Sequence, residues 1–204
     1  NNRFFVTIYL AILKSGNTVV PLDPMLEEEK FKYISDVSEA AIVFLVPAVK
    51  TRLNLTDREY FLPEYMDSIL EVVQPLKETD FDSERTAELI FTSGSTGTPK
   101  GVMLSHKNLI ANTASIVEYL GLNDHDRMLV VLPFYYCYGL SLLHTHLRVG
   151  GSLVFNNSFI FLGSVLNDLK SYGCTGFAGV PSHFQILLRK SDSFKTTAFP
   201  DLRY

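Results

Sequence analysis

Cysteine is scarce in this sequence: Cys137 and Cys174 are the only two, and neither belongs to a CxxC pair or lies near clustered histidines. A disulfide framework or a zinc site would need more of these ligands, so neither organises the chain. We therefore expect a reducing, cytoplasmic setting.

An excess of basic residues is also lacking, because 18 Lys and Arg stand against 22 Asp and Glu, giving a formal net charge of -4. Binding to nucleic-acid phosphates or to an anionic membrane surface relies on positive charge, so we expect neither partner. The longest early apolar stretch, Phe4–Leu13, is about half of the ~20 residues that span a bilayer. It also lacks the charged start and the cleavage site of a secretory signal, and we interpret it as a buried helix.

The composition is that of a folded protein, since 47% of the 204 residues are hydrophobic and 20% are charged. The sequence does not begin with Met and ends at Arg203-Tyr204 without a closing feature. We therefore expect an internal piece of a longer protein.

Short apolar runs alternate with stretches of helical periodicity, which predicts an α/β fold of mostly parallel sheets flanked by helices. The expected helices are Phe4–Leu13, Glu27–Ser35, Ser105–Tyr119, Leu140–Leu147, Ser164–Tyr172 and one that begins at Pro181. The expected strands are Thr18–Val20, Ala41–Leu45, Leu89–Thr92, Met128–Leu132, Ser152–Phe155 and Gly176–Gly179. Residues 46–88 are the least regular part, and a boundary near Asp80 would give partial subdomains 1–80 and 81–204.

The most informative segment is Phe91–Gly101, FTSGSTGTPKG, which directly follows an expected strand. Its glycines let the backbone turn tightly and expose N–H groups, its hydroxyls add donors, and Lys100 adds a positive charge. This combination suits a polyphosphate. It is not a Walker loop, because Pro99 precedes Lys100 and Gly101 follows it. The ordered ending Thr-Pro-Lys-Gly also distinguishes it from a flexible Gly/Ser linker.

Thr92–Gly101 resembles the signature phosphate loop of the superfamily of AMP-forming acyl-CoA synthetases, peptide-synthetase adenylation domains and luciferases. The resemblance extends along most of the chain, through Tyr9–Gly16, Val19–Pro24, Gly150–Val154 and Gly179–Ser182. It implies part of the layered N-terminal domain of an adenylate-forming enzyme. The family's Glu-bearing loop, ribose-binding Asp, hinge and C-terminal catalytic domain with its Lys are not in this sequence, so no catalytic residue is assigned.

By this resemblance, the parent enzyme uses ATP and Mg²⁺ to convert a carboxylic acid into an acyl-adenylate and pyrophosphate, and then transfers the acyl group to a thiol. The thiol would belong to coenzyme A or to an acyl carrier protein. The residues implied in phosphate binding are Thr92, Ser93, Gly94, Ser95, Thr96, Gly97, Thr98 and Lys100. Thr92 or Thr96 would lie near Mg²⁺, and Thr96 is the residue assigned to the metal.

A second segment, Leu132–Ser141, follows a strand and opens a helix, and in the family this stretch lines the carboxylate pocket. Many acyl and aryl ligases have a His where Tyr136 stands, and a Tyr carries no charge near neutral pH. The residues expected to bind substrate are Tyr136, Tyr138, Gly139, Val180 and His183. His183 has an alternative interpretation as a capping or surface residue, and the tyrosines as a purely structural aromatic cluster.

The substrate class follows from a missing charge. Amino-acid-activating members place an Asp in this segment to pair the substrate ammonium, whereas no Asp or Glu occurs between Arg127 and Asn167. A buried ammonium without a counter-charge is strongly disfavoured, which favours a fatty, aryl or other non-amino acid. Asn156-Asn157 stands where many thioester-forming relatives have a basic residue near coenzyme A, which weakens the case for that acceptor. An amino-acid adenylation enzyme and a non-catalytic nucleotide-binding module remain alternatives.

Overall fold

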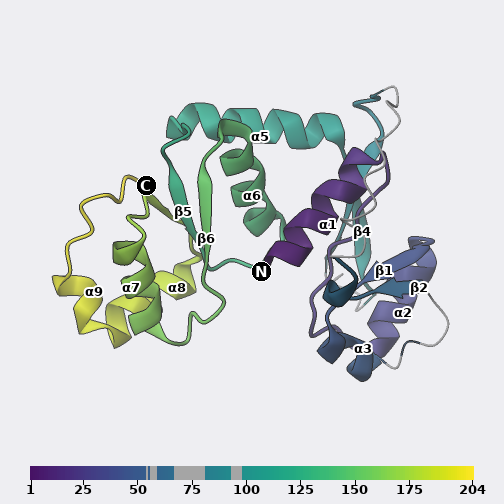
Figure 1. Cartoon of the computed structure of the whole chain (residues 1–204), viewed down its shortest axis with the longest axis horizontal. Coiled ribbons are helices and arrows are strands. Elements are labelled where there is room, and N and C mark those ends of the chain that lie inside the picture. Colours follow the sequence, from purple (N-terminus) through teal and green to yellow (C-terminus); the bar gives the residue numbers. More distant parts are fainter. Residues whose placement is uncertain (54, 56–58, 67–80, 93–97) are drawn as a thin grey trace. The chain divides into compact units, whose positions relative to one another are not determined.

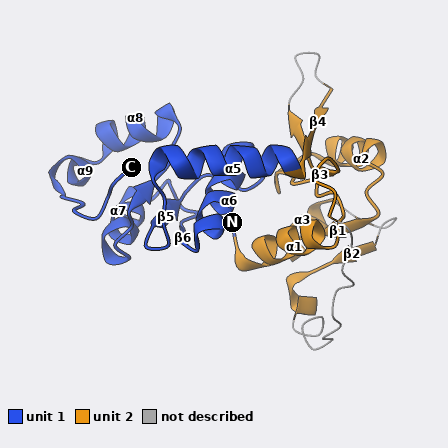
Figure 2. Cartoon of the chain, turned by 90° about the horizontal axis from the view of Figure 1, so that it is seen from above, with its two compact units in different colours: residues 1, 107–204 blue, residues 2–106 orange. Residues whose placement is uncertain are grey.

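The structure is a computed structural model that describes residues 1–53, 55, 59–66, 81–92 and 98–204. These residues form two compact units, one of residues 2–106 and one of residue 1 together with residues 107–204 (Figure 2). Each unit is described by itself below. The boundary expected near Asp80 lies outside the described residues, so the division into 1–80 and 81–204 stays a prediction.

The unit of residues 2–106 begins with helix α1 (Arg3–Lys14), which is capped by Asn2: its side-chain oxygen accepts from the Phe5 N–H at 2.8 Å. The cap satisfies an N–H group that the first helical turn leaves unpaired. Helix α2 (Glu28–Val37) follows, with Phe31 and Ile34 on its buried face. Between the helices, Val19 forms a parallel bridge with Glu88, which is all that the structure forms of the strand expected at Thr18–Val20.

The chain then forms a small parallel sheet of two strands, β1 (Ile42–Phe44) and β2 (Glu59–Phe61), connected through α3 (Pro47–Leu53) (Figure 1). The rings of Phe44 and Phe61, which are register partners, stack 5.5 Å apart. A short 3-10 turn, η1 (Pro63–Tyr65), follows β2. The sheet is therefore held by an aromatic cross-strand pair as well as by backbone hydrogen bonds.

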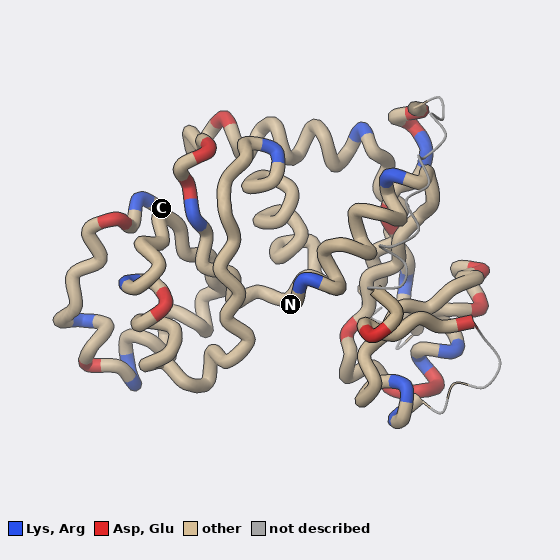
Figure 3. The backbone as a smooth tube through the Cα atoms, viewed as in Figure 1, with Lys and Arg blue, Asp and Glu red and all other residues tan. Residues whose placement is uncertain are grey.

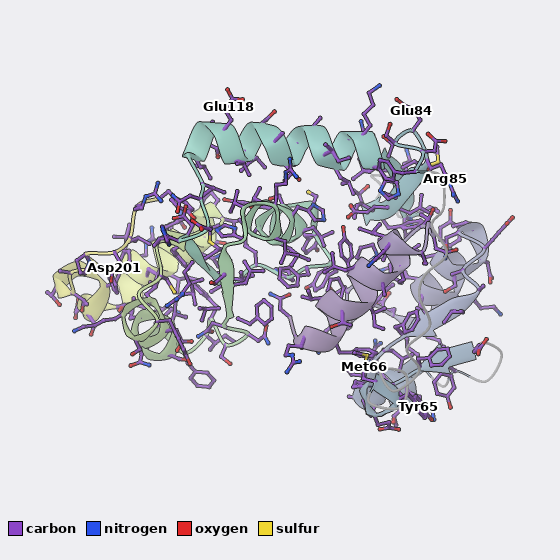
Figure 4. All side chains as sticks on the ribbon, turned by 45° about the horizontal axis from the view of Figure 1, so that its top comes forward. Tyr65, Met66, Glu84, Arg85, Glu118 and Asp201 are labelled. Atoms are coloured by element: carbon purple, nitrogen blue, oxygen red, sulfur yellow. The ribbon has the colours of Figure 1, made fainter. Side chains whose placement is uncertain are left out.

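Strands β3 (Thr86–Thr92) and β4 (Lys100–Ser105) complete this unit as an antiparallel hairpin. Arg85, labelled in Figure 4, precedes β3 and donates from Nη2 to the Gly16 carbonyl at 2.8 Å, which ties the start of β3 to the end of α1. Ala87 and Ile90 of β3 are buried, whereas Met103 of β4 is 71% exposed. The hairpin thus has one strand in the core and one at the surface.

The second unit contains most of α5 (His106–Leu120) and a three-stranded parallel sheet in the order β6-β5-β7. Its strands are β5 (Arg127–Val130), β6 (Ser152–Phe155) and β7 (Gly176–Phe177). Helices α6 (Cys137–Val149) and α7 (Leu162–Ser171) connect them, and α8 (Pro181–Lys190) and α9 (Asp192–Thr196) follow. Gly150 ends α6 with a φ of 76°, a left-handed conformation that glycine adopts without strain.

Strand β5 is buried on both faces, since Met128, Leu129 and Val130 are each at most 2% exposed. Leu129 packs into a cluster with α7, α8 and β7, and Figure 1 shows α6 on the other side of β5 and β6. The cluster consists of Leu129, Val165, Leu166, Leu169, Cys174, Phe177 and Leu187. Helices on both faces explain why β5 is continuously apolar instead of alternating.

A buried carboxylate holds the end of the chain against this sheet. Asp126 is fully buried and accepts hydrogen bonds from the Asn123 N–H, the Thr175 hydroxyl and Arg203 Nη1 at 2.7 to 2.9 Å. Burial raises the pKa of Asp126, but these hydrogen bonds and the Arg203 charge outweigh it, so the pKa is lowered overall. The Nε2 atom of His146 and the Tyr204 hydroxyl form a hydrogen bond of 3.0 Å, which adds a second link to the end of the chain.

Charged residues of both signs are interspersed over the two units (Figure 3). In the part of the chain that the structure describes, no helix combines the length and apolar character needed to cross a membrane.

Most of the predicted elements are confirmed, with ends that differ by at most three residues. Other features differ from the prediction. Residues 46–88 contain α3 and β2, which the irregular composition of that stretch concealed, and α9 follows α8. The pair β3–β4 is antiparallel, since the seven residues between its strands are too few for a helical crossover, while the other strand pairs among the described residues are parallel.

Candidate functional site

The first part of the candidate site is the hairpin formed by β3 and β4. Thr92 and Lys100 are register partners at the end of the hairpin that leads into residues 93–99, and the Thr92 hydroxyl donates to the Lys100 carbonyl at 3.5 Å. Both residues are exposed, as is Thr98. The remaining predicted phosphate-binding residues, Ser93, Gly94, Ser95, Thr96 and Gly97, lie outside the described residues, and with them lies the predicted metal residue Thr96.

Gly101 allows the two strands of this hairpin to pair closely beside an aromatic ring. It stands opposite Phe91, and a Cβ placed on Gly101 would lie 3.0 Å from the Phe91 ring. The ring thus covers the backbone where a side chain would otherwise project. The prediction that Gly101 lets the backbone turn is wrong, because Gly101 lies within strand β4, where it accommodates the ring of its cross-strand partner Phe91.

A groove of about 610 Å³ runs along the hairpin on the side of α2. It is lined from the hairpin by Phe91, Lys100 and Met103, among others, and from the end of α2 by Tyr33, Val37 and Glu39. The Lys100 side chain thus borders an open, partly apolar surface beside the predicted phosphate loop. An exposed ammonium in this position can attract and hold an anionic group, with the Thr92 hydroxyl as a neighbouring donor.

Beneath the hairpin lies a buried polar pair that the sequence analysis missed. The Tyr9 hydroxyl of α1 donates to Glu88 Oε1 of β3, and both side chains are 1% exposed. Burial raises the pKa of Glu88, and the hydrogen bond from Tyr9 partly offsets this. Burial and the nearby Glu88 carboxyl raise the pKa of Tyr9 far above its usual value. The pair anchors the strand that leads into the predicted phosphate loop.

The second part of the candidate site is the aromatic segment that follows β5. Tyr136 is the N-cap residue of α6, and Tyr138 lies in its first turn; they are 55% and 46% exposed. The rings of Tyr135 and Tyr136 lie 4.8 Å apart. The alternative that Tyr136 and Tyr138 are core residues is wrong for the described chain, because both side chains reach the surface and are accessible to a ligand.

Gly139 is buried, and it brings α6 against the backbone that follows β5. A Cβ at Gly139 would lie 2.1 Å from the Pro133 carbonyl oxygen, far inside van der Waals contact. Only glycine allows this approach. The first turn of α6, which carries Tyr138, and the N-cap residue Tyr136 are thereby held against Leu132-Pro133.

The third part is the start of α8. Val180 is its N-cap residue, and its N–H lies 3.4 Å from His183 Nδ1, which accepts the hydrogen bond. The His183 ring packs 4.2 Å from the ring of Phe159, and burial lowers the pKa of His183. His183 therefore does cap α8, as one of the two predicted interpretations has it, and its ring packs against Phe159.

The structure brings together the predicted residues within each part. Thr92, Thr98 and Lys100 belong to the unit of residues 2–106, and Tyr136, Tyr138, Gly139, Val180 and His183 belong to the other unit. Tyr9 and Glu88 were missed because a sequence does not show which helix covers a strand. A single acidic residue inside the apolar strand Thr86–Thr92 is the signal that could have indicated them.

Comparisons with known proteins point to one family over the whole chain. The model of the family described as AMP-binding enzyme matches residues 1–204. The oxalate–CoA ligase of Arabidopsis thaliana is 25% identical and is matched over 100% of this chain and 43% of its own length. One component of the linear gramicidin synthase of Brevibacillus parabrevis is 28% identical over 87% of this chain, which corresponds to 2% of that protein.

Solved structures show the same fold. The N-terminal domain of FACL13 from Mycobacterium tuberculosis superposes with a TM-score of 0.89 at 19% identity, over 100% of this chain and 53% of that one. ATP-bound MatB from Rhodopseudomonas palustris superposes with a TM-score of 0.80 at 26% identity, over 94% of this chain and 40% of that one. The α/β fold expected from the sequence, that of the N-terminal domain of adenylate-forming enzymes, is thereby confirmed.

The 204 residues span less than half of the length of the two curated relatives. Within that span, the family match covers the hairpin with Thr92 and Lys100, the aromatic segment that opens α6 and the start of α8. This chain belongs to the AMP-binding enzyme family, together with acyl-CoA ligases and the adenylation domains of peptide synthetases.

Proposed function

We propose that the protein containing this chain is an AMP-forming ligase that activates an acyl or aryl carboxylic acid with ATP and transfers the acyl group to a thiol. The carboxylate attacks the α-phosphorus of ATP, an acyl-adenylate forms and pyrophosphate leaves. The observation that carries the proposal is the β3–β4 hairpin, which sets Thr92 and Lys100 side by side at the two ends of the Ser/Gly/Thr-rich loop.

The hairpin residues suit the charge problem of this reaction. A carboxylate that approaches ATP is repelled by the phosphates, and negative charge accumulates on the departing pyrophosphate. Lys100 supplies a positive charge and Thr92 a hydroxyl donor, both exposed where the two strands meet the Ser/Gly/Thr-rich loop. Groups held in place before the reaction stabilise such charge most effectively. The buried Tyr9–Glu88 pair supports the strand that presents them.

ATP and Mg²⁺ are the proposed cofactors. ATP-bound MatB shares this fold at 26% identity, which supports ATP here. Mg²⁺ usually keeps several waters and binds through nucleotide phosphates with few protein ligands. An exposed threonine hydroxyl such as that of Thr92 fits this pattern, and Thr96 is proposed as the other metal-side hydroxyl. The remaining phosphate contacts are assigned to Ser93, Gly94, Ser95, Gly97 and Thr98.

We propose a non-amino carboxylic acid as substrate, bound by Tyr136, Tyr138, Gly139, Val180 and His183. The support comes from the charge of the region: residues 128–166 contain no acidic side chain that could pair a substrate ammonium. The exposed rings of Tyr136 and Tyr138 offer apolar contact area and hydroxyl donors. Since burial lowers the pKa of His183, its ring would contact substrate as a neutral group.

The proposed acceptor is the thiol of coenzyme A or of an acyl carrier protein. The oxalate–CoA ligase relative favours coenzyme A, and the gramicidin synthase relative favours a carrier protein. The free cysteines Cys137 and Cys174 agree with the proposed cytoplasmic setting. We further propose that the 204 residues alone fold without completing adenylation, because the family's ribose-binding and C-terminal catalytic segments are not among them.

Amino-acid adenylation is the second candidate, favoured by the 28% identity to the gramicidin synthase component. Exchange of labelled pyrophosphate into ATP by the full-length protein tests both candidates with panels of fatty, aryl and amino acids. Exchange that depends on a fatty or aryl acid supports the proposal, and preferential exchange with an amino acid reverses the order. A folded protein that binds ATP and shows no exchange with any panel would instead be a non-catalytic nucleotide-binding module.

A further inference from the structure

The side chain of Asn1 binds the backbone of the segment that follows β5. Its Nδ2 donates to the Leu132 carbonyl at 2.8 Å, and its Oδ1 accepts from the Phe134 N–H at 2.9 Å. Both hydrogen bonds are partly buried. The carboxamide therefore pairs with residues on either side of Pro133 in the same way as the backbone of a neighbouring strand would.

This pairing occurs where the sheet itself can no longer hold the chain. The ladder between β5 and β6 ends at Val130, whose carbonyl accepts from the Asn156 N–H. Pro133 has no N–H and cannot extend a ladder. The Asn1 side chain thus takes over from β6 in fixing the course of Leu132–Phe134.

Asn157 fixes Asn1 in turn. The main-chain nitrogen of Asn1 donates to Asn157 Oδ1 at 2.8 Å, and Asn157 Nδ2 donates to the Asn1 carbonyl at 2.7 Å. Asn157 follows β6, just as Leu132–Phe134 follows β5. Two carboxamides in series therefore connect the carboxyl ends of two neighbouring strands, and the geometry of each end depends on the other.

The fixed segment leads directly into the proposed carboxylate pocket. The Pro133 carbonyl is the group against which Gly139 packs so closely that a Cβ would lie 2.1 Å away. A displacement of Leu132–Phe134 therefore moves the first turn of α6, which carries Tyr138, and the N-cap Tyr136. We propose that Asn1 and Asn157 are positioning residues that set the Tyr136–Gly139 segment for the carboxylic acid. This inference rests on the proposed function.

Asn1→Asp is the sharpest test, because it removes the Nδ2 donor and sets a carboxylate oxygen against the Leu132 carbonyl while it keeps nearly the same size. Asn157→Asp removes only the donor to the Asn1 carbonyl. Asn167→Asp is the matched control in the same unit: its exposed side chain accepts from the Ser171 hydroxyl at 3.3 Å, which a carboxylate also does. Asn1→Ala guards against effects of the new charge.

Two readouts are made on the full-length protein. In carboxylate-dependent pyrophosphate exchange, Asn1→Asp and Asn1→Ala are expected to raise KM for the carboxylic acid about tenfold, equivalent to about 1.4 kcal/mol, with KM for ATP changed less than about twofold. Asn157→Asp is expected to raise KM for the carboxylic acid less, and Asn167→Asp is expected to leave it unchanged. In hydrogen exchange, peptides from residues 132–140 are expected to lose protection about tenfold in the Asn1 variants, while those from 126–130 keep it.

If the Asn1 variants match Asn167→Asp in both readouts, the positioning role is wrong. It is equally wrong if KM for ATP and KM for the acid rise by the same factor, because a general loss of structure would then explain the effect. A wild-type protein without any carboxylate-dependent exchange would refute the proposed function instead. Hydrogen exchange would in that case still decide whether Asn1 holds residues 132–140.

Discussion

Replacement of Gly139 by alanine is expected to destabilise the unit of residues 107–204 through a single steric conflict. The new Cβ would lie 2.1 Å from the Pro133 carbonyl oxygen and 2.7 Å from its carbonyl carbon. Both atoms are backbone, so relief requires a shift of α6 or of the segment after β5. Overpacking of this kind costs about 1–3 kcal/mol.

Helix propensity works in the opposite direction and allows a matched control. Alanine is preferred over glycine by up to about 1 kcal/mol within a helix. Gly163 lies in the first turn of α7, and a Cβ placed on it meets nothing within 4 Å. Gly163→Ala is therefore expected to be neutral or slightly stabilising. For Gly139→Ala, the clash at the upper end of its range less the propensity gain leaves a loss of about 2 kcal/mol.

Urea unfolding of the 204-residue chain, followed by circular dichroism, measures both variants. With a slope of roughly 2 kcal/mol per molar urea, Gly139→Ala should lower the midpoint by about 1 M, and Gly163→Ala should not lower it. Equal midpoints for the two variants would refute the close approach of α6 to Pro133. The inference that Gly139 positions Tyr136 and Tyr138 would then lose its structural basis.

Three further predictions concern buried groups. Tyr9→Phe removes the hydroxyl that donates to the buried Glu88 and should lower the free energy of unfolding in urea by about 1–3 kcal/mol. The control Tyr119→Phe, at a residue that is 73% exposed, should lower it by almost nothing. Equal losses in the two variants would contradict the Tyr9–Glu88 hydrogen bond. Burial lowers the pKa of His144 to about 4, so the unfolded chain takes up a proton below pH 6.5 that the folded chain does not. The unfolding free energy should therefore fall from pH 6.5 to pH 4, and His144→Gln should flatten that fall; an unchanged slope would exclude His144 as its cause. Cys137 is exposed, whereas burial raises the pKa of Cys174 to about 11, so a thiol reagent at pH 8 should label Cys137 alone in the folded chain, and labelling of Cys174 would show that its site is open.

The regular elements could be predicted because their patterns are local. Strand β6 lies where the sequence places it, and α1 and α5 differ from the prediction by one residue at each end. α3 was missed because residues 46–88 show no regular pattern, although Pro47 suits the first turn of a helix. β2 is only three residues long and depends on its pairing with β1, which no local pattern shows.

In the candidate site, too, local features could be predicted and contacts between distant residues could not. The composition and order of Phe91–Gly101 predict a phosphate loop, and the residue types at Tyr136 and Tyr138 are visible in the sequence. Contacts between distant residues are not. Tyr9 and Glu88 are 79 positions apart, and Asn1 and Asn157 are 156 apart. Each of these contacts depends on how separate elements pack against one another, which a single sequence does not show.

Competition for ATP on the 204-residue chain tests most directly whether the Thr92–Lys100 hairpin holds phosphates. Binding of a labelled ATP analogue is measured for the wild type, for Lys100→Ala and for a control variant, Lys170→Ala, at an exposed lysine of α7. Pyrophosphate should displace the analogue, adenosine should hardly compete, and Lys100→Ala should weaken binding about tenfold while Lys170→Ala leaves it unchanged. Competition by adenosine as effective as that by pyrophosphate, or equal binding by the two lysine variants, would contradict a phosphate-binding hairpin.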